Sequence, residues 1–169
     1  WPFAFNHRAI GYRGEQKHID LSFSGILQTK NKDAVQTDLR LKIMQNLFYC
    51  AGDIPFFKRA RFRNMTIVFN AIPRSLLSYY ISLLLRRRQY FDIKEYRMLQ
   101  NSTKVFLNTL SPMGLISPRY FESMASKSLV FCEESSLYGN IFPKDCYLSF
   151  EPNLEDFDDK LSYVLSESS

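Results

Sequence analysis

The stretch that decides the fold is Lys104–Glu134, which reads KVFLNTLSPMGLISPRYFESMASKSLVFCEE. Its apolar run Val105–Leu107 predicts a short buried strand, and a loop follows. Ser117 and Pro118 are typical of a helix start, because a serine hydroxyl can cap free backbone N–H groups and proline tolerates the first helical position. A second apolar run, Leu129–Phe131, predicts another strand. A strand, loop, helix and strand in about 30 residues form one βαβ unit.

The same alternation extends over the rest of the chain. His18–Ser24 alternates apolar and polar residues up to Gly25, which is typical of a strand, and Asp33–Ala51 predicts a helix because apolar residues recur every four positions. Further strands are expected at Thr66–Ala71 and Cys146–Phe150, and further helices at Leu76–Leu85, at Asp92–Gln100 and after a capping Asn153 with Glu155 and Asp156 in the first turn; Phe56–Arg63 has no clear pattern. This order predicts an α/β fold, a Rossmann-like and mostly parallel sheet with helices on both faces.

Length and composition indicate one globular domain. The chain has 169 residues, of which 46% are hydrophobic and 23% are charged. We expect residues 1–17 to be a linker or N-terminal arm, and residues 18–169 to be the domain. The aromatic content of 15% predicts an aromatic-rich core or, alternatively, an aromatic surface that meets a partner. The net charge of +5 suits phosphate-bearing ligands but is too small for a dedicated nucleic-acid binder.

The cysteines and the apolar runs argue against a zinc-binding protein and against a membrane-spanning protein. Cys50, Cys132 and Cys146 are scattered without the spacing of zinc ligands, so we expect no metal site, free thiols and a reducing, cytoplasmic location. Cys132 and Cys146 fall in predicted strands. The longest apolar run, Leu76–Leu85, is too short and too polar to cross a bilayer, and no signal peptide precedes it, so we expect no transmembrane segment.

The residues that carry chemistry lie where strands give way to loops. In parallel sheets, ligands bind beyond the carboxyl ends of the strands, which points to the loops after Gly25 and Asn108. The predicted helix start at Ser117 offers free N–H groups to a phosphate, and Arg119 adds a bidentate donor. Glu122 shares a helix face with Arg119, and a carboxylate there suits the adjacent hydroxyls of a ribose. The alternative is a surface pair of Arg119 and Glu122 worth a few tenths of a kcal/mol.

The run SPRYFESMASKSLVFCEE resembles the donor-site segment of GT-B-fold glycosyltransferases, and within that group it is most similar to the spore-maturation type. Their C-terminal domains carry a pattern close to R-x-x-E-A-M-A-x-G-x-x-V. Arg119, Glu122, Met124 and Ala125 match this pattern. IDLSFSG resembles the first strand of the same domain, and WPFAFN resembles the interdomain linker that precedes it.

This resemblance implies the donor-binding portion of an enzyme that transfers a sugar from a nucleotide-diphosphate sugar to an unknown acceptor. The glutamate that matches Glu122 would hold the ribose, and the helix start at Ser117 and Arg119 would face the diphosphate. Lys30 and Lys32, after the first strand and Gly25, would be further phosphate-binding residues, and the two lysines can equally be solvated loop charges. The resemblance implies no cofactor and no obligatory metal.

The chain also departs from the family pattern. Gly114 stands where many members carry a second glutamate, eight residues before Glu122, so a direct carboxylate contact to the donor sugar is not expected. In the family, the acceptor site and any catalytic base come from a preceding N-terminal Rossmann-like domain, which is therefore an expected partner. The catalytic residue is unknown, since His7 and His18 are isolated.

A different class of function stays open. The basic residues Arg86–Arg88, with those of Lys58–Arg63, could form a rim that binds nucleic acid or an acidic protein, which would make the chain a non-catalytic binding module. The same charges also fit a solvated surface, and Arg86–Arg88 suit the C-terminal end of a helix. The acidic run Glu151–Asp159 is explained by carboxylates at a helix start.

Overall fold

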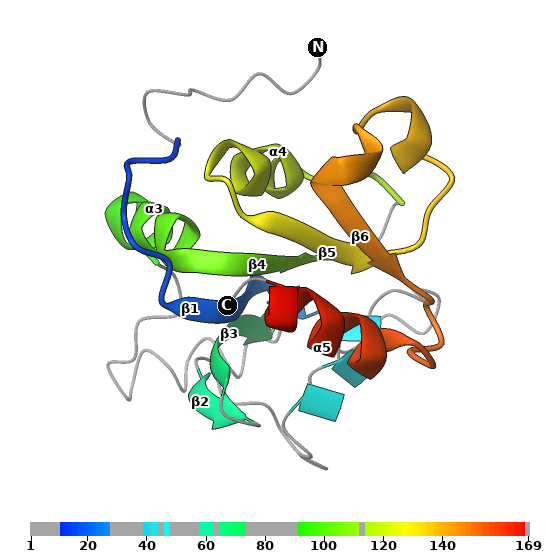
Figure 1. Cartoon of the computed structure of the whole chain (residues 1–169), viewed down its shortest axis with the longest axis horizontal. Coiled ribbons are helices and arrows are strands. Elements are labelled where there is room, and N and C mark those ends of the chain that lie inside the picture. The colour runs from blue at the N-terminus through cyan, green and yellow to red at the C-terminus, as the bar shows by residue number, and fades with distance from the viewer. Residues whose placement is uncertain are drawn as a thin grey trace.

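In the computed structural model, which describes residues 11–27, 39–40, 42–43, 46–47, 58–62, 65–73, 91–111 and 114–167, a six-stranded sheet lies between helices on its two faces (Figure 1). The strands are β1 (Ile19–Leu27), β2 (Lys58–Phe62), β3 (Met65–Pro73), β4 (Thr103–Asn108), β5 (Leu129–Glu133) and β6 (Tyr147–Phe150). The helices are α3 (Ile93–Ser102), α4 (Pro118–Ala125) and α5 (Phe157–Glu167), with short 3-10 turns η1 (Tyr138–Asn140) and η2 (Lys144–Cys146). The described parts of 39–47 are also helical.

The sheet has the order β2-β3-β1-β4-β5-β6. Its neighbours are parallel except for the edge strand β2, which pairs antiparallel with β3. Leu21 in the middle of β1 lies opposite Ile67 of β3 and Val105 of β4. The chain moves from β1 to β3 on one side and then crosses to β4 on the other side. The strand order therefore reverses between β1 and β4, which is the position where open α/β sheets bind ligands.

The pleat of the strands sends alternate side chains to two separate cores. In β4, Val105 and Leu107 join the core under α5, whereas Phe106 packs under α3. In β5, Phe131 faces α5, and Val130 and Cys132 face α4. The α5 core also buries Leu39, Ile43, Leu47, Phe157, Leu161 and Val164. Both faces of the sheet are thus covered, which confirms the predicted α/β class.

Aromatic rings fill these cores. Phe131, Phe150 and Phe157 contact one another, with ring centroids 4.9–5.2 Å apart. On the other face, Tyr120 and Tyr138 pack with ring centroids 5.7 Å apart, and their hydroxyl groups are 2.9 Å apart. Most of the aromatic side chains described in these two clusters are buried, in agreement with an aromatic-rich core.

Several predicted boundaries are wrong. β1 continues through Gly25 to Leu27, because Gly25 still pairs with β3. Cys146 lies in η2 and precedes β6. The Asn153 side chain accepts a hydrogen bond from the backbone N–H of Glu155 in a turn before α5, so this helix begins at Phe157. The unassigned Phe56–Arg63 contains β2. The predicted helix Leu76–Leu85 and the basic Arg86–Arg88 lie outside the described residues.

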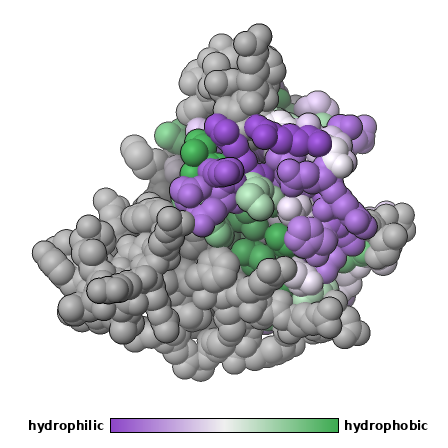
Figure 2. Space-filling view, turned by 90° about the vertical axis from the view of Figure 1, so that its left-hand side faces the viewer, coloured by the Kyte–Doolittle hydropathy of each residue, from purple (hydrophilic) through white to green (hydrophobic). Residues whose placement is uncertain are grey.

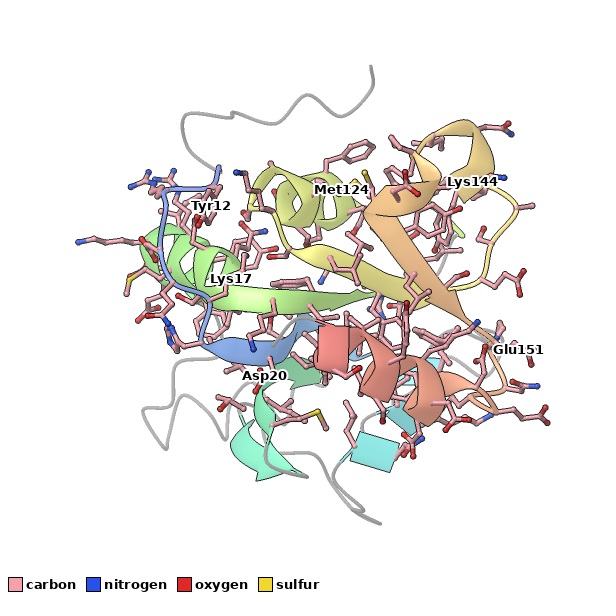
Figure 3. The ribbon with its side chains drawn as sticks, in the orientation of Figure 1. Tyr12, Lys17, Asp20, Met124, Lys144 and Glu151 are labelled. Carbon is pink, nitrogen blue, oxygen red and sulfur yellow. The ribbon has the colours of Figure 1, made fainter. Side chains whose placement is uncertain are left out.

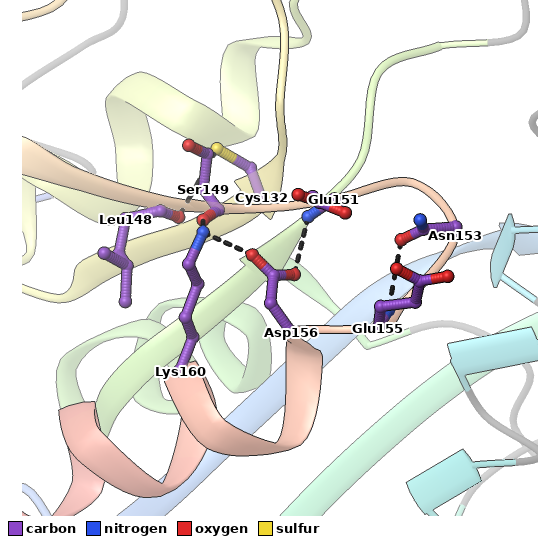
Figure 4. A network of polar contacts seen from close by, with 8 residues as sticks. All are labelled: Cys132, Leu148, Ser149, Glu151, Asn153, Glu155, Asp156 and Lys160. Atoms are coloured by element: carbon purple, nitrogen blue, oxygen red, sulfur yellow. Dashed lines mark hydrogen bonds and ion pairs between the residues drawn. The ribbon is translucent and has the colours of Figure 1, made fainter.

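The acidic run organises the start of α5. Lys160 pairs with Asp156 and donates a hydrogen bond of 2.7 Å to the carbonyl of Ser149 on β6 (Figure 4). The carboxylate of Asp156 accepts the backbone N–H of Glu151 at 2.8 Å. These contacts tie the helix to the neighbouring strand. Among the side chains that the structure describes, no group of three or more His, Cys, Asp or Glu could hold a metal ion.

Residues 11–17, the described part of the predicted arm, pack along the amino edge of the sheet (Figure 3). The backbone N–H of Tyr12 donates to Ala125 at the end of α4, at 3.1 Å. The Lys17 ammonium group donates to the carbonyls of Thr103 and Ser126, at 2.6 and 3.0 Å, and to the hydroxyl of Ser128 at 3.0 Å. Lys17 therefore joins the arm to β4 and to the end of α4.

Figure 2 looks onto the side of the molecule that is on the left in Figure 1, where the described surface is mostly hydrophilic around a smaller hydrophobic area. None of the described helices has the length and apolar character that crossing a bilayer requires.

Candidate functional site

The candidate site lies at the carboxyl edge of the sheet, between β1 and β4. Arg119, in the first turn of α4, donates a hydrogen bond from Nη1 to the carbonyl of Ser24 on β1. Gly25 makes this approach feasible, since a Cβ there would lie 2.7 Å from Arg119 Nη1 and 2.9 Å from the ring carbon Cζ of Phe23. The structure thus brings together Gly25 and Arg119, two residues that the sequence predicts for phosphate binding, although they are far apart in the chain.

Arg40 is a second arginine of this site, and it is not among the residues that the sequence predicts for ligand binding. Its side chain is 5% exposed, and it donates hydrogen bonds from Nε to the hydroxyl of Thr109 and from Nη2 to the carbonyl of Leu110, the latter at 2.8 Å. One signal was present in the sequence. Arg40 lies three residues before Ile43 and seven before Leu47, so it interrupts the apolar face of the predicted helix with a charge.

Glu133, at the end of β5, contributes a buried carboxyl group. It is 3% exposed, and its Oε1 accepts the backbone N–H of Leu110 at 2.6 Å. Its Oε2 is buried and has no hydrogen-bond partner within the described structure. Burial raises the pKa of Glu133, against the opposing effects of two backbone hydrogen bonds and the nearby charge of Arg40.

The two arginines lie close enough to influence each other. Burial and, after it, the positive charge of Arg119 lower the pKa of Arg40 to about 10, while Glu133 and Tyr120 act in the opposite direction. Two like charges that lie near each other are unfavourable unless an anion neutralises them. Both arginines therefore bring positive charge to the carboxyl edge, and the carboxyl group of Glu133 acts on Arg40 there.

The start of α4 lies in the same region. Ser117 is the N-cap residue and Pro118 is the first helical residue, as predicted, but the Ser117 hydroxyl makes no capping hydrogen bond. The predicted side-chain cap is therefore wrong, and this hydroxyl is one of the buried polar atoms without a partner in the described part of the chain. The first N–H groups of a helix have no partner within the helix, but Pro118 has no N–H and the Tyr120 N–H donates to the carbonyl of Ser117 at 3.2 Å. The donor that the start of α4 can present is therefore the backbone N–H of Arg119.

Glu122 points to a different neighbour from Arg119. Its Oε2 accepts hydrogen bonds from the hydroxyl of Tyr96 at 3.1 Å and from the Gln100 amide at 3.3 Å, both on α3. Glu122 is therefore held between α3 and α4, about one helical turn beyond Arg119. Burial and Glu122 raise the pKa of Tyr96, and the positive charge of Arg119 lowers it. Arg119 therefore lies near enough to Tyr96 and Glu122 to belong to the same region.

A family model described as glycosyl transferase-like matches residues 51–169 of the chain. The chain belongs to the glycosyl transferase-like family. The match runs from before β2 to the end of the chain, so it includes Arg119, Glu122 and Glu133. Comparison with curated proteins gave no significant match. Membership of this family suggests transferase activity with a sugar donor, and it confirms the resemblance described above.

The loop after β4 of this glycosyl transferase-like domain contains a tight turn. Gly114 has φ +70°, and its N–H donates to the carbonyl of Ser111 at 2.8 Å. The Ser111 N–H in turn donates to the carbonyl of Leu115 at 2.9 Å. This left-handed conformation favours glycine. Gly114, the residue at which the chain departs from the resembled glycosyltransferase pattern, therefore serves the turn in this chain.

The remaining predicted residues of the domain fall outside the site or outside the described residues. Lys30, Lys32 and His7 belong to the undescribed parts, so their roles stay predictions. His18 is exposed, and its Nδ1 lies 3.3 Å from the carbonyl of Gln16 in the arm at the amino edge. We assign no catalytic residue within the described structure.

Proposed function

We propose that this domain binds the nucleotide-diphosphate sugar of a glycosyltransferase, which transfers the sugar to a separate acceptor. The observation that carries the proposal is the convergence of Arg40 and Arg119, from separate segments, beside the start of α4 and the switch point of the sheet. A diphosphate is the part of such a donor that carries negative charge, and guanidinium groups bind phosphate oxygens with bidentate hydrogen bonds.

Arg119 has the donor groups that this role requires. Its Nη1 is engaged with Ser24, whereas its Nε and Nη2 have no hydrogen-bond partner within the described structure. The half-buried guanidinium is therefore fixed at one nitrogen and can donate from the other two. The backbone N–H of Arg119, in the first turn of α4, adds a further donor. The proposal assigns charge neutralisation to these groups and requires no metal ion.

Glu122 is proposed to hold the ribose of the donor, as the family resemblance implies. Its Oε2 is fixed by Tyr96 and Gln100, and a carboxylate fixed by neighbours can accept hydrogen bonds from sugar hydroxyls without losing side-chain entropy on binding. The acceptor site and any catalytic base are proposed to come from a preceding Rossmann-like domain.

Calorimetric titration with uridine, guanosine, adenosine, cytidine and thymidine diphosphates tests the proposal. We expect one or more to bind, with affinity unchanged by a chelator. Arg119→Gln should weaken binding about 10- to 100-fold, because a hydrogen bond to a charged group contributes about 1.5–3 kcal/mol. Lys144→Gln removes the same charge from the exposed η2 turn and is the matched control, for which we expect no change.

Two results would overturn the proposal. One is that none of the five diphosphates binds to the folded protein. The other is that Arg119→Gln and Lys144→Gln bind as tightly as the parent protein. Salt-sensitive binding of single-stranded RNA, with no nucleotide binding, would favour the binding module instead.

A further inference from the structure

The backbone of Leu110 is held by two buried side chains of opposite charge. Glu133 accepts its N–H at 2.6 Å, and Arg40 donates to its carbonyl at 2.8 Å. Leu110 lies directly after β4, at the start of the loop that leads to α4. The carboxyl of Glu133 therefore acts on the same loop and on the same arginine that the proposed donor site uses.

The two oxygens of the Glu133 carboxyl group differ in their hydrogen bonding. Oε1 has its backbone partner, while the buried Oε2 has none in the part of the chain that the structure describes. An ionised carboxylate with a buried and unpaired oxygen is costly, whereas a protonated oxygen needs less solvation. In the free protein, two backbone hydrogen bonds and, after them, the nearby charge of Arg40 favour the ionised form of this carboxyl.

The other titratable groups that the structure describes around Glu133 do not change their charge near neutral pH. Tyr120 on α4, Tyr138 on η1 and Cys132 on β5 all interact with it electrostatically, and burial raises the pKa of each well above neutral. Arg40 faces Glu133 from the helical segment after β1 and keeps its positive charge, and Arg119 acts on Arg40 from α4. Among the described neighbours, Glu133 is thus the group whose protonation can respond to a ligand.

A bound diphosphate changes the balance at this carboxyl. Its negative charge pairs with the arginines and so weakens the attraction that keeps Glu133 ionised, and it repels a carboxylate directly. We infer that Glu133 takes up one proton from the solvent when an anionic donor occupies the site, so that donor binding is coupled to protonation of this carboxyl. This inference rests on the proposed function. The proton converts the carboxylate to the neutral acid at the unpaired Oε2, and no other bond changes.

Linkage gives the size of the effect. If one proton is taken up per ligand, the dissociation constant rises tenfold for each pH unit across the window in which the free protein is ionised and the complex is protonated. The ligand itself should release protons on binding, which is the opposite of proton uptake by Glu133. The reason is that the arginines favour full ionisation of a terminal phosphate, whose second pKa is about 6. Measurements above pH 7 therefore separate the two effects.

The experiment is calorimetry of the whole chain with the tightest-binding nucleoside diphosphate, between pH 6.0 and 8.5. Each titration is repeated in buffers with different enthalpies of ionisation, which gives the number of protons exchanged. We expect the parent protein to take up as much as about one proton more than Glu133→Gln, which keeps the shape and the hydrogen bond to Leu110 but cannot titrate. We also expect the affinity of this variant to be nearly independent of pH above 7.

Equal proton exchange by the parent protein and Glu133→Gln across the range would overturn the inference. If the variant does not fold, the parent protein alone is measured above pH 7. Net proton uptake with the diphosphate, and none with the uncharged nucleoside, supports the inference. No proton uptake with the diphosphate overturns it. The proposed function fails separately, because it requires only that a nucleoside diphosphate binds and that Arg119 matters.

Discussion

The substitution Gly25→Ala is the most direct test of the site geometry. The added Cβ would lie 2.7 Å from Arg119 Nη1 and 2.9 Å from Phe23 Cζ. Ordinary van der Waals contact begins near 3.4 Å, so both groups must move by several tenths of an ångström. Arg119 is the end of a flexible side chain and can yield, but it then loses its hydrogen bond to Ser24.

Two costs follow from this displacement. Loss of a hydrogen bond from a charged donor costs about 1.5–3 kcal/mol, and overpacking of a buried position costs about 1–3 kcal/mol. These costs overlap, since the arginine moves to relieve the crowding. We therefore expect Gly25→Ala to lower the free energy of unfolding by about 1–3 kcal/mol. Because the displaced Arg119 no longer points to the site, we also expect diphosphate affinity to fall about 10- to 100-fold.

The assay combines urea denaturation for stability with calorimetry for binding. Gly139→Ala is the matched control, because a Cβ at Gly139 meets no atom within 4 Å and Gly139 is an exposed residue of the η1 turn. If Gly25→Ala unfolds and binds as Gly139→Ala does, then Arg119 does not lie against Gly25 and the description of the site is wrong. A second comparison is the double variant with Arg119→Gln, in which the binding effect of Gly25→Ala should largely disappear.

Three further predictions concern other buried groups. Burial lowers the pKa of Lys17 from 10.5 to about 8, so the unfolded chain binds more protons than the folded chain between these pH values. In thermal melts, the stability of the parent protein relative to Lys17→Gln should therefore rise with pH from about 8 to 10.5. The raised pKa of Glu133 makes stability depend on pH in the opposite direction. Chemical denaturation should show that its stabilising contribution is present below about pH 4.5 and is lost as the pH rises through the pKa of the folded protein, whereas Glu133→Gln should not show this loss. Tyr138→Phe leaves the buried Tyr120 hydroxyl without its 2.9 Å partner and should cost about 1–3 kcal/mol in urea denaturation, whereas the double variant with Tyr120→Phe should cost less than the sum of the two single variants.

The fold could be predicted from the sequence because its signals are local. The apolar runs Val105–Leu107 and Leu129–Phe131 each give a strand, and Pro118 marks the first residue of α4. Asp92, the first residue of the predicted helix, is the N-cap of α3, and its carboxylate accepts two backbone N–H groups. Periodicity and capping chemistry act over a few residues, so they are visible without the tertiary structure.

The site was predicted only in part, because its remaining groups depend on contacts between distant segments. Arg119 and Gly25 were found from the helix start and the strand end, but their direct contact spans 94 positions of the chain. Arg40 needs Thr109 and Leu110 to satisfy its buried guanidinium, and Glu133 needs the N–H of Leu110. Charged residues are normally expected at the surface, so the sequence pattern alone does not predict that Arg40 and Glu133 are buried in a site.

Three described features that break the local pattern lie at one edge of the sheet. Gly25 is a glycine inside a strand, Arg40 is a charge on an apolar helix face, and Glu133 is an acid that ends a buried strand. Each costs stability by itself, through lost packing or through burial of a polar group. The three positions are distant in the sequence, and their described contacts meet at Arg119, Thr109 and Leu110. Costs that are concentrated in this way are expected where a chain maintains a ligand site, since locally consistent sequences tolerate such exceptions mainly at functional positions.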